Sequence, residues 1–187
     1  MFANSGYYAT RVIDIVKSAG VAKGLFYWYF ENKEALFIQI VQATRDDLRR
    51  AQAKAIEGET DPLERIAKGI DASLRFISEN EQLYVLLRFA GTEDRFASLI
   101  EEATQIHALD TSKHIKDAID QGKVIDADPL VMAHAVVATV FHFARIRSAA
   151  GADFEIDELS SFVSSFCLRG LGADLSAVSH PKARATG

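Results

Sequence analysis

The sequence predicts an all-α fold in which a small N-terminal helical head precedes a larger helical body. Apolar residues recur at helical spacing along almost the whole chain, and no segment alternates convincingly with the period of two that marks a β-strand. Only three prolines and eleven glycines interrupt the 187 residues, which favours long helices over a strand-and-turn architecture. A chain of this length can bury a sizeable core.

Composition predicts a soluble cytoplasmic protein. The single Cys167 leaves no internal disulfide, which fits a reducing compartment. The chain does not open with a basic segment followed by an apolar run, so we predict no signal peptide. The longest apolar stretch, 130–144, contains His134 and His142 and falls short of the roughly 18 residues expected of a membrane span, so we expect no membrane partner.

The net charge of −5 is unevenly distributed along the chain. Residues 1–50 hold seven Lys or Arg against five Asp or Glu, whereas the remaining residues hold fourteen against twenty-one. The N-terminal segment can therefore approach phosphate groups while the rest of the chain stays away from them.

The head is expected to contain two short helices joined by a tight turn at Gly20, which is the pattern of a helix-turn-helix. Thr10 can cap the first helix, Gly20 suits the left-handed conformation that ends it, and Asn32 can cap the long helix that follows. The three expected helices cover residues 11–19, 23–30 and 33–55.

The polar segment 57–62 is the expected boundary between head and body. Asp61-Pro62 and Asp128-Pro129 each supply a capping carboxylate followed by a first-turn proline. Further helices are expected from Pro62 through Ile77 and over 81–90, 93–121, 129–149 and 156–170. The predicted regions are therefore a head of residues 1–50, a body of residues 51–175 and a disordered tail of residues 176–187.

The second short helix is expected to expose aromatic side chains. Tyr27 and Trp28 fall on the same side of the helical wheel as Lys23, and a soluble protein has little reason to expose them unless something covers them. A DNA major groove is one such cover, although a short aromatic-rich helical hairpin more often belongs to a core. The side expected to face the core carries Phe26, Tyr29 and Phe30, with Ile15 and Val21 beside it.

The spacing of glycines and aromatics in this region also matches a known signature. The matching elements are Gly6-Tyr7-Tyr8-Ala9-Thr10, then Ala19-Gly20-Val21-Ala22-Lys23-Gly24-Leu25-Phe26-Tyr27-Trp28-Tyr29-Phe30, then Asn32-Lys33-Glu34-Ala35-Leu36. Residues 2–41 thereby closely resemble the DNA-binding signature of the TetR (tetracycline-repressor-like) family of transcriptional regulators.

The resemblance implies a homodimeric, ligand-responsive repressor whose second short helix enters the major groove of a pseudo-palindromic operator in double-stranded DNA. It implies that Tyr27 and Lys33 clamp phosphates and that Gly24 allows close approach of the backbone. The DNA-facing set that it implies is Thr10, Arg11, Ala22, Lys23, Gly24, Leu25, Tyr27, Trp28 and Lys33.

Three departures from the family pattern stand out. Ala22 occupies a position where the family usually has a capping Ser or Thr, a loss of about 1 kcal/mol of capping energy. Leu25 replaces a usually small or polar residue and can touch a thymine methyl group. Only Met1 to Ser5 precede the Gly-Tyr element, so we expect most of the family's first helix to be missing from a truncated head.

Two further sets of residues are expected in the body. The apolar faces of the last two long helices predict a four-helix dimer interface, with a buried hairpin inside one protomer as the alternative. Aromatic and aliphatic residues of the middle helices are candidates to line a pocket for an apolar or amphipathic effector, although each one is more often plain core. The interface set is Val136, Val140, Leu159, Phe162, Val163 and Phe166. The effector set is Phe76, Tyr84, Leu87, Phe89, Phe96, Ile100, Phe141 and Phe143.

The sequence favours a DNA-binding transcriptional regulator over two other classes. One rival is a dimeric small-molecule-binding module whose truncated head no longer binds DNA. The other is an enzyme, but the chain has no nucleophile elbow, phosphate loop or metalloprotease motif, so we expect no catalytic activity and no cofactor. His107, Asp110 and His114 share a helix face, yet solvated polar residues are the commoner explanation, so we expect no metal site.

Overall fold

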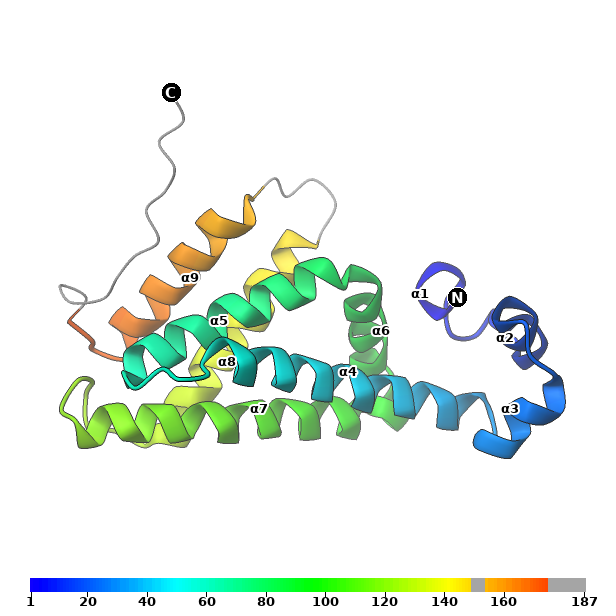
Figure 1. The fold of residues 1–187 in the computed structure, drawn as a ribbon, viewed down its shortest axis with the longest axis horizontal. Helices are drawn as coiled ribbons and strands as arrows, with labels where there is room; N and C mark the ends of the chain where they lie inside the picture. Colours follow the sequence, from blue (N-terminus) through cyan, green and yellow to red (C-terminus); the bar gives the residue numbers. More distant parts are fainter. Residues whose placement is uncertain (149–153, 175–187) are drawn as a thin grey trace, which may run out of the picture. The chain divides into compact units, whose positions relative to one another are not determined.

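The computed structural model describes residues 1–148 and 154–174, and every regular element in those residues is a helix, as predicted (Figure 1). The tail predicted at 176–187 lies outside the described residues, as does Ala149 at the predicted end of one helix. The helices are α1 (Phe2–Ser5), α2 (Val12–Ala19), α3 (Lys23–Tyr29), α4 (Lys33–Ala55), α5 (Pro62–Glu79), α6 (Glu81–Thr92), α7 (Asp94–Asp120), α8 (Pro129–Arg147) and α9 (Ile156–Gly170).

Most helix ends follow local chemistry that the sequence already indicates. The Asp128 carboxylate caps α8 by accepting backbone N–H groups at 2.8 and 3.1 Å, and Pro129 follows at the first helical position. Asn32 and Asp61 cap α4 and α5 in the same way, each accepting a backbone N–H at 2.8 Å. Gly20 ends α2 with φ of 68°, the left-handed conformation that glycine adopts without strain.

The predicted cap of α2 at Thr10 is wrong. Thr10 is buried, and its hydroxyl donates to the Gly6 carbonyl oxygen at 2.7 Å. The cap position belongs to Arg11, whose backbone N–H donates to the Asp14 carboxylate at 3.4 Å while its Nε donates at 2.9 Å. An acidic residue in the first turn thus takes the role expected of the threonine.

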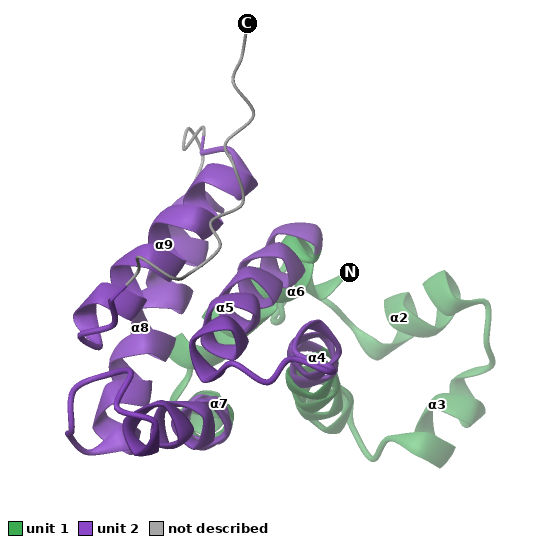
Figure 2. Cartoon of the chain, turned by 60° about the vertical axis from the view of Figure 1, so that its left-hand side comes forward, with its two compact units in different colours: residues 1–47, 80–103 green, residues 48–79, 104–187 purple. Residues whose placement is uncertain are grey.

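The chain divides into two compact units, shown in different colours in Figure 2. The first contains residues 1–47 together with 80–103, so α6 and the start of α7 belong with the head. Its core is rich in aromatic rings, with Phe37 and Phe96 fully buried and their ring centroids 4.6 Å apart. The other buried members of this core are Phe2, Tyr7, Val41, Leu86 and Ala90.

The second unit contains residues 48–79 and 104–187, and its described core joins α5, α8 and α9. Polar contacts fix α5 to α9, because Asp71 accepts hydrogen bonds from both Arg75 and Ser160, and Arg75 also pairs with Asp157 at 2.6 Å. The buried apolar residues of these helices include Ile66, Ile70, Leu74, Val136, Val140, Leu159 and Val163.

Helix α8 is unusually apolar. By length and composition it is the one helix in the described residues that is able to cross a bilayer, although the 130–144 stretch looked too short in the sequence. Single helices of this kind also form the cores of soluble proteins, and α8 packs against α5 and α9. Only 33% of the apolar stretch of α8 is buried within the protomer. We therefore expect a partner to cover part of the remaining apolar surface.

Candidate nucleic-acid interface

Helix α3 exposes nearly all of its side chains, and Phe26 is its one buried residue. The Phe26 ring packs against Phe30 at 5.4 Å and Tyr27 at 5.3 Å between centroids, and α3 packs against α2. Trp28 is 75% exposed, and Tyr27 and Leu25 are also exposed, as the sequence predicts. An anchored helix with one buried residue presents the remaining aromatic surface outward.

Tyr29 and Val21 are more exposed than the sequence predicts. Both were expected to face the core with Phe26, but Tyr29 is 64% exposed and Val21 is also exposed. The Tyr29 ring packs edge-on against Trp28, with centroids 4.5 Å apart, so it extends the exposed aromatic surface. A helix of seven residues that packs chiefly against α2 leaves too little covered surface for a second inward-facing ring.

The N-terminal end of α3 is exposed to solvent. Lys23 is exposed, with its ammonium 5.8 Å from the centre of the Tyr27 ring. A Cβ added to Gly24 would meet no atom within 4 Å, so packing inside the protein does not require a glycine there. Ala22 stands at the cap position and provides no side-chain hydrogen bond, as its identity predicts.

Arg11 is exposed beside this surface and is held by Asp14. Their ion pair measures 2.9 Å, and the hydrogen bond from Arg11 lowers the pKa of the Asp14 carboxyl below its usual range. The Arg11 guanidinium thus stands at the start of α2 in a defined position. Thr10, by contrast, is buried and does not belong to the exposed face.

Lys33 also differs from its predicted surroundings. Its ammonium donates to the Tyr7 carbonyl oxygen at 2.7 Å and to the Thr10 carbonyl oxygen at 2.9 Å. The same ammonium lies 4.3 Å from the centre of the Tyr7 ring. Burial lowers the pKa of Lys33, and the positive charge of Arg95 lowers it further.

Residues outside the predicted head also hold its N-terminal turn. The Arg95 guanidinium lies 4.8 Å from the centre of the Tyr7 ring and pairs with Glu34 at 3.2 Å, while Tyr8 donates a hydrogen bond to Glu93. Sequence reasoning did not identify Glu93 or Arg95, because nothing in the local pattern around α7 indicates contact with residues some 85 positions earlier.

The eight candidate effector residues divide between the two units. Phe96 belongs to the aromatic core of the first unit, and Leu87, Phe89 and Ile100 pack against that core. Tyr84 is buried in α6 of the same unit. Phe76, Phe141 and Phe143 belong to the second unit. There, the Phe141 ring lies 5.9 Å from the buried His107, and the Phe143 ring lies 5.7 Å from Phe162.

The six candidate interface residues are of two kinds. Phe162 and Phe166 are 55% and 56% exposed, and their rings stack with centroids 6.1 Å apart. The other four are buried within the protomer, where they join α8 and α9 to the rest of the second unit, so they are not accessible to a partner. This corrects the prediction for Val136, Val140, Leu159 and Val163.

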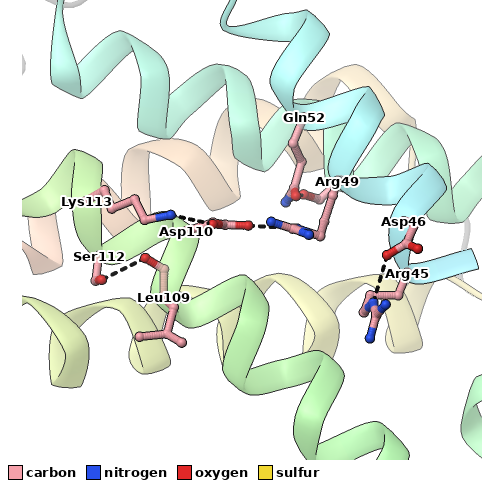
Figure 3. Close-up of polar contacts among 9 residues, drawn as sticks. Arg45, Asp46, Arg49, Gln52, Leu109, Asp110, Ser112 and Lys113 are labelled. Carbon is pink, nitrogen blue, oxygen red and sulfur yellow. Dashed lines mark hydrogen bonds and ion pairs between the residues drawn. The ribbon is translucent and has the colours of Figure 1, made fainter. Parts of the chain in front are cut away.

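The acidic member of the His107, Asp110 and His114 face is held in ion pairs. Asp110 pairs with Arg49 of α4 and with Lys113, each at 2.8 Å, so its carboxylate is neutralised by two cations (Figure 3). Among the residues that the structure describes, no group of three or more His, Cys, Asp or Glu is arranged to hold a metal ion. His134 and His142 of α8 are both exposed.

Comparisons with known proteins place these features in context. Residues 1–40 match the family model described as bacterial regulatory proteins, tetR family. The chain is 30% identical over 108 residues to the HTH-type transcriptional activator FasR of Mycolicibacterium smegmatis, which covers 56% of this chain and 49% of FasR. It is 35% identical over 95 residues to the HTH-type transcriptional regulator LmrA of Bacillus subtilis, covering 50% of this chain and 44% of LmrA.

The fold likeness extends over almost the whole chain. The structure of the TetR family transcriptional regulator PfmR from Thermus thermophilus superposes with a TM-score of 0.72 at 23% identity, covering 91% of this chain and 93% of PfmR. In sequence, however, the chain spans about half the length of the curated relatives it matches, or less.

Proposed function

From the premise that the chain belongs to the TetR family of bacterial regulatory proteins, we propose that it is a sequence-specific DNA-binding regulator of transcription and acts as a ligand-responsive repressor. The observation that carries the proposal is the exposed face of α3. This face carries three large aromatic side chains, Tyr27, Trp28 and Tyr29, whose exposure to water is unfavourable. Lys23 is exposed beside them. We infer a cytoplasmic protein without catalytic activity.

In this proposal α3 enters the major groove. Lys23 and Tyr27 contact phosphates, and Leu25 contacts a thymine methyl group. The glycine at position 24 is a weaker helix former than alanine, and no packing contact requires it, so close approach to DNA supplies a reason for it. The remaining proposed contacts are Arg11, Ala22 and Trp28. We add Tyr29 to this set because its side chain is exposed.

The proposed regulator works as a dimer. A two-fold symmetric protein reads two half-sites of a pseudo-palindrome with two copies of the same helix. The exposed pair Phe162 and Phe166 on α9 supports a partner surface there, and the partly uncovered α8 supports its extension. An apolar or amphipathic effector would act by favouring a protomer arrangement that mismatches the half-sites.

Fluorescence anisotropy on the palindrome upstream of the gene tests the DNA contact. Leu25→Ala should weaken binding by about 1–3 kcal/mol for one or two base positions and leave the others unchanged. Val85→Ala is a matched control, because Val85 is also 46% exposed but lies on α6. Equal binding of wild type and Leu25→Ala to every base variant would remove the proposed role of Leu25.

The same assay decides between the two functional classes. If the full chain binds neither the palindrome nor a random-sequence duplex at low salt, the DNA-binding proposal fails. The alternative, a dimeric small-molecule-binding module, would then be favoured.

A further inference from the structure

We propose that α3 distinguishes base pairs by the C5-methyl groups of their pyrimidines, through an apolar side of the helix formed by Gly24, Leu25 and Trp28. The inference rests on the proposed function, in which α3 enters the major groove, and it names the chemical feature that the helix reads there. Thymine presents such a methyl group in the major groove, and 5-methylcytosine carries one at the same ring position.

The exposed residues of α3 divide into sides of different chemistry. Lys23 and Tyr27 are one turn apart and form a polar side, in which the Lys23 ammonium lies 5.8 Å from the centre of the Tyr27 ring. Gly24 and Trp28 are also one turn apart, and Leu25 precedes Trp28 by three residues, so these three residues share another side. The cation of α3 and its apolar surface are thus separated around the helix.

The apolar side has little capacity for hydrogen bonds with bases. Leu25 is 46% exposed and has no polar atom, while the side chain of Trp28, 75% exposed, has the indole N–H as its one donor. A Cβ added to Gly24 would meet no atom within 4 Å, so the backbone at this position is open to an approaching base. Paired hydrogen bonds to one base require a side chain such as Arg, Lys, Asn or Gln, and this side carries none. Contact with a methyl group is the means of distinguishing bases that remains to an apolar side chain.

Tyr29 supports the exposed ring of Trp28. The two rings meet edge-on, with centroids 4.5 Å apart and an angle of 88° between their planes. This arrangement is favourable for aromatic pairs, so the indole has a preferred position although most of its surface is exposed. A large apolar surface in a preferred position can distinguish a base pair that has a methyl group from one that lacks it.

The expected effect of one methyl group is small but measurable. Covering a single methyl group changes a binding constant about fourfold. Each base position occurs twice in a two-fold symmetric complex, so loss of the methyl group from both copies should lower the affinity about fifteenfold.

The first experiment removes methyl groups from DNA that the protein itself selects. The full chain is used to select duplexes from a random-sequence library, and fluorescence anisotropy then measures binding to a selected duplex. Deoxyuridine replaces thymine at one symmetric pair of positions at a time, which keeps every hydrogen-bonding group of the base and removes the methyl group. We expect a loss of about fifteenfold at one or two positions of each half-site. Equal affinity for the thymine and deoxyuridine duplexes at every position would overturn the proposal.

The second experiment moves the methyl group to a different base pair. At the sensitive positions, a duplex with 5-methylcytosine should bind about fifteenfold more tightly than the same duplex with cytosine, because the methyl group occupies the same place in the groove. No gain on methylation would overturn the proposal, since thymine would then be recognised through its other groups.

The third experiment assigns the contact to side chains. In Leu25→Ala or Trp28→Ala, the ratio of affinities for the thymine and deoxyuridine duplexes should fall from about fifteen towards one at the positions that the lost side chain covers. Lys23→Met is the matched control from the polar side of α3, and it should weaken binding to both duplexes while keeping the ratio. A ratio unchanged in both Leu25→Ala and Trp28→Ala would overturn the proposal, because the methyl effect would then arise from the stiffness of the DNA.

These experiments separate failure of this inference from failure of the proposed function. If the chain selects no duplex and binds none at low salt, both proposals are overturned. If it binds a selected duplex equally well with and without the methyl groups, DNA binding stands and the reading of methyl groups is overturned.

Discussion

Substitution within the stacked pair Phe162 and Phe166 is the most direct test of the proposed dimer interface. Each ring is more than half exposed in the protomer, and a Phe side chain can bury about 150–250 Å². Covering the exposed part of Phe166 therefore removes about 100 Å² from water in each protomer. At about 25 cal/mol per Å², and with both symmetric copies lost, Phe166→Ala should weaken the dimer by about 5 kcal/mol.

A loss of this size raises the dimer dissociation constant roughly four-thousandfold. Sedimentation equilibrium over a range of protein concentrations measures it directly. Phe166→Arg should have a larger effect, because it places an unpaired guanidinium in an apolar interface. The control Val85→Ala removes an exposed apolar side chain from α6 and should leave the dimer intact.

A wild-type protein that sediments as a monomer at micromolar concentration would contradict this prediction. It is also refuted if Phe166→Ala dimerises as tightly as wild type, since the stacked pair would then not be covered by the partner.

Two further predictions concern stability. The hydrogen bond from Lys123 lowers the pKa of Asp61, so its contribution to stability should be present above the unfolded pKa of about 4 and lost as the pH falls through the folded value. Because both side chains are partly exposed, Asp61→Asn should cost under about 1 kcal/mol at pH 7 and less at pH 3, with asparagine keeping the helix cap. Thermal unfolding at both pH values checks this, and an equal cost at pH 3 would contradict it. An apolar effector that raises the melting temperature should weaken operator binding, and bound operator should weaken effector binding by the same factor. Calorimetry with and without the operator duplex measures both, and a stabilising compound that leaves operator affinity unchanged would count against the sensor mechanism.

Local chemistry was predictable from the sequence, whereas the burial of particular faces was only partly so. Asp128 and Gly20 end helices where expected, because a cap or a left-handed glycine depends on the nearest few residues. Tyr29 shows the limit of a helical wheel: its position on the wheel is correct, but whether that side is covered depends on distant parts of the chain. Thr10 shows a second limit, since a neighbouring acid displaced it as the cap.

Four of the six predicted interface residues are buried within the protomer for a related reason. Val136 and Leu159 are apolar at helical spacing, which predicts burial but does not say whether their own protomer or a partner provides the cover. Phe162 has the same spacing and is exposed. The contacts of α6 and α7 with the N-terminal turn were harder still to predict from the sequence. Arg95 lies over the Tyr7 ring across a large separation in sequence, which no local pattern indicates.

The membership of residues 80–103 in the first compact unit has a consequence for any attempt to transplant this head onto another regulator. The ring of Tyr7 has Phe89 and Phe96 among its neighbours, and both come from outside the first fifty residues. A chimera that exchanges only the N-terminal segment would pair these rings with foreign partners. The transferable module is therefore discontinuous, and an exchange that preserves folding should carry α6 and the beginning of α7 along with the head.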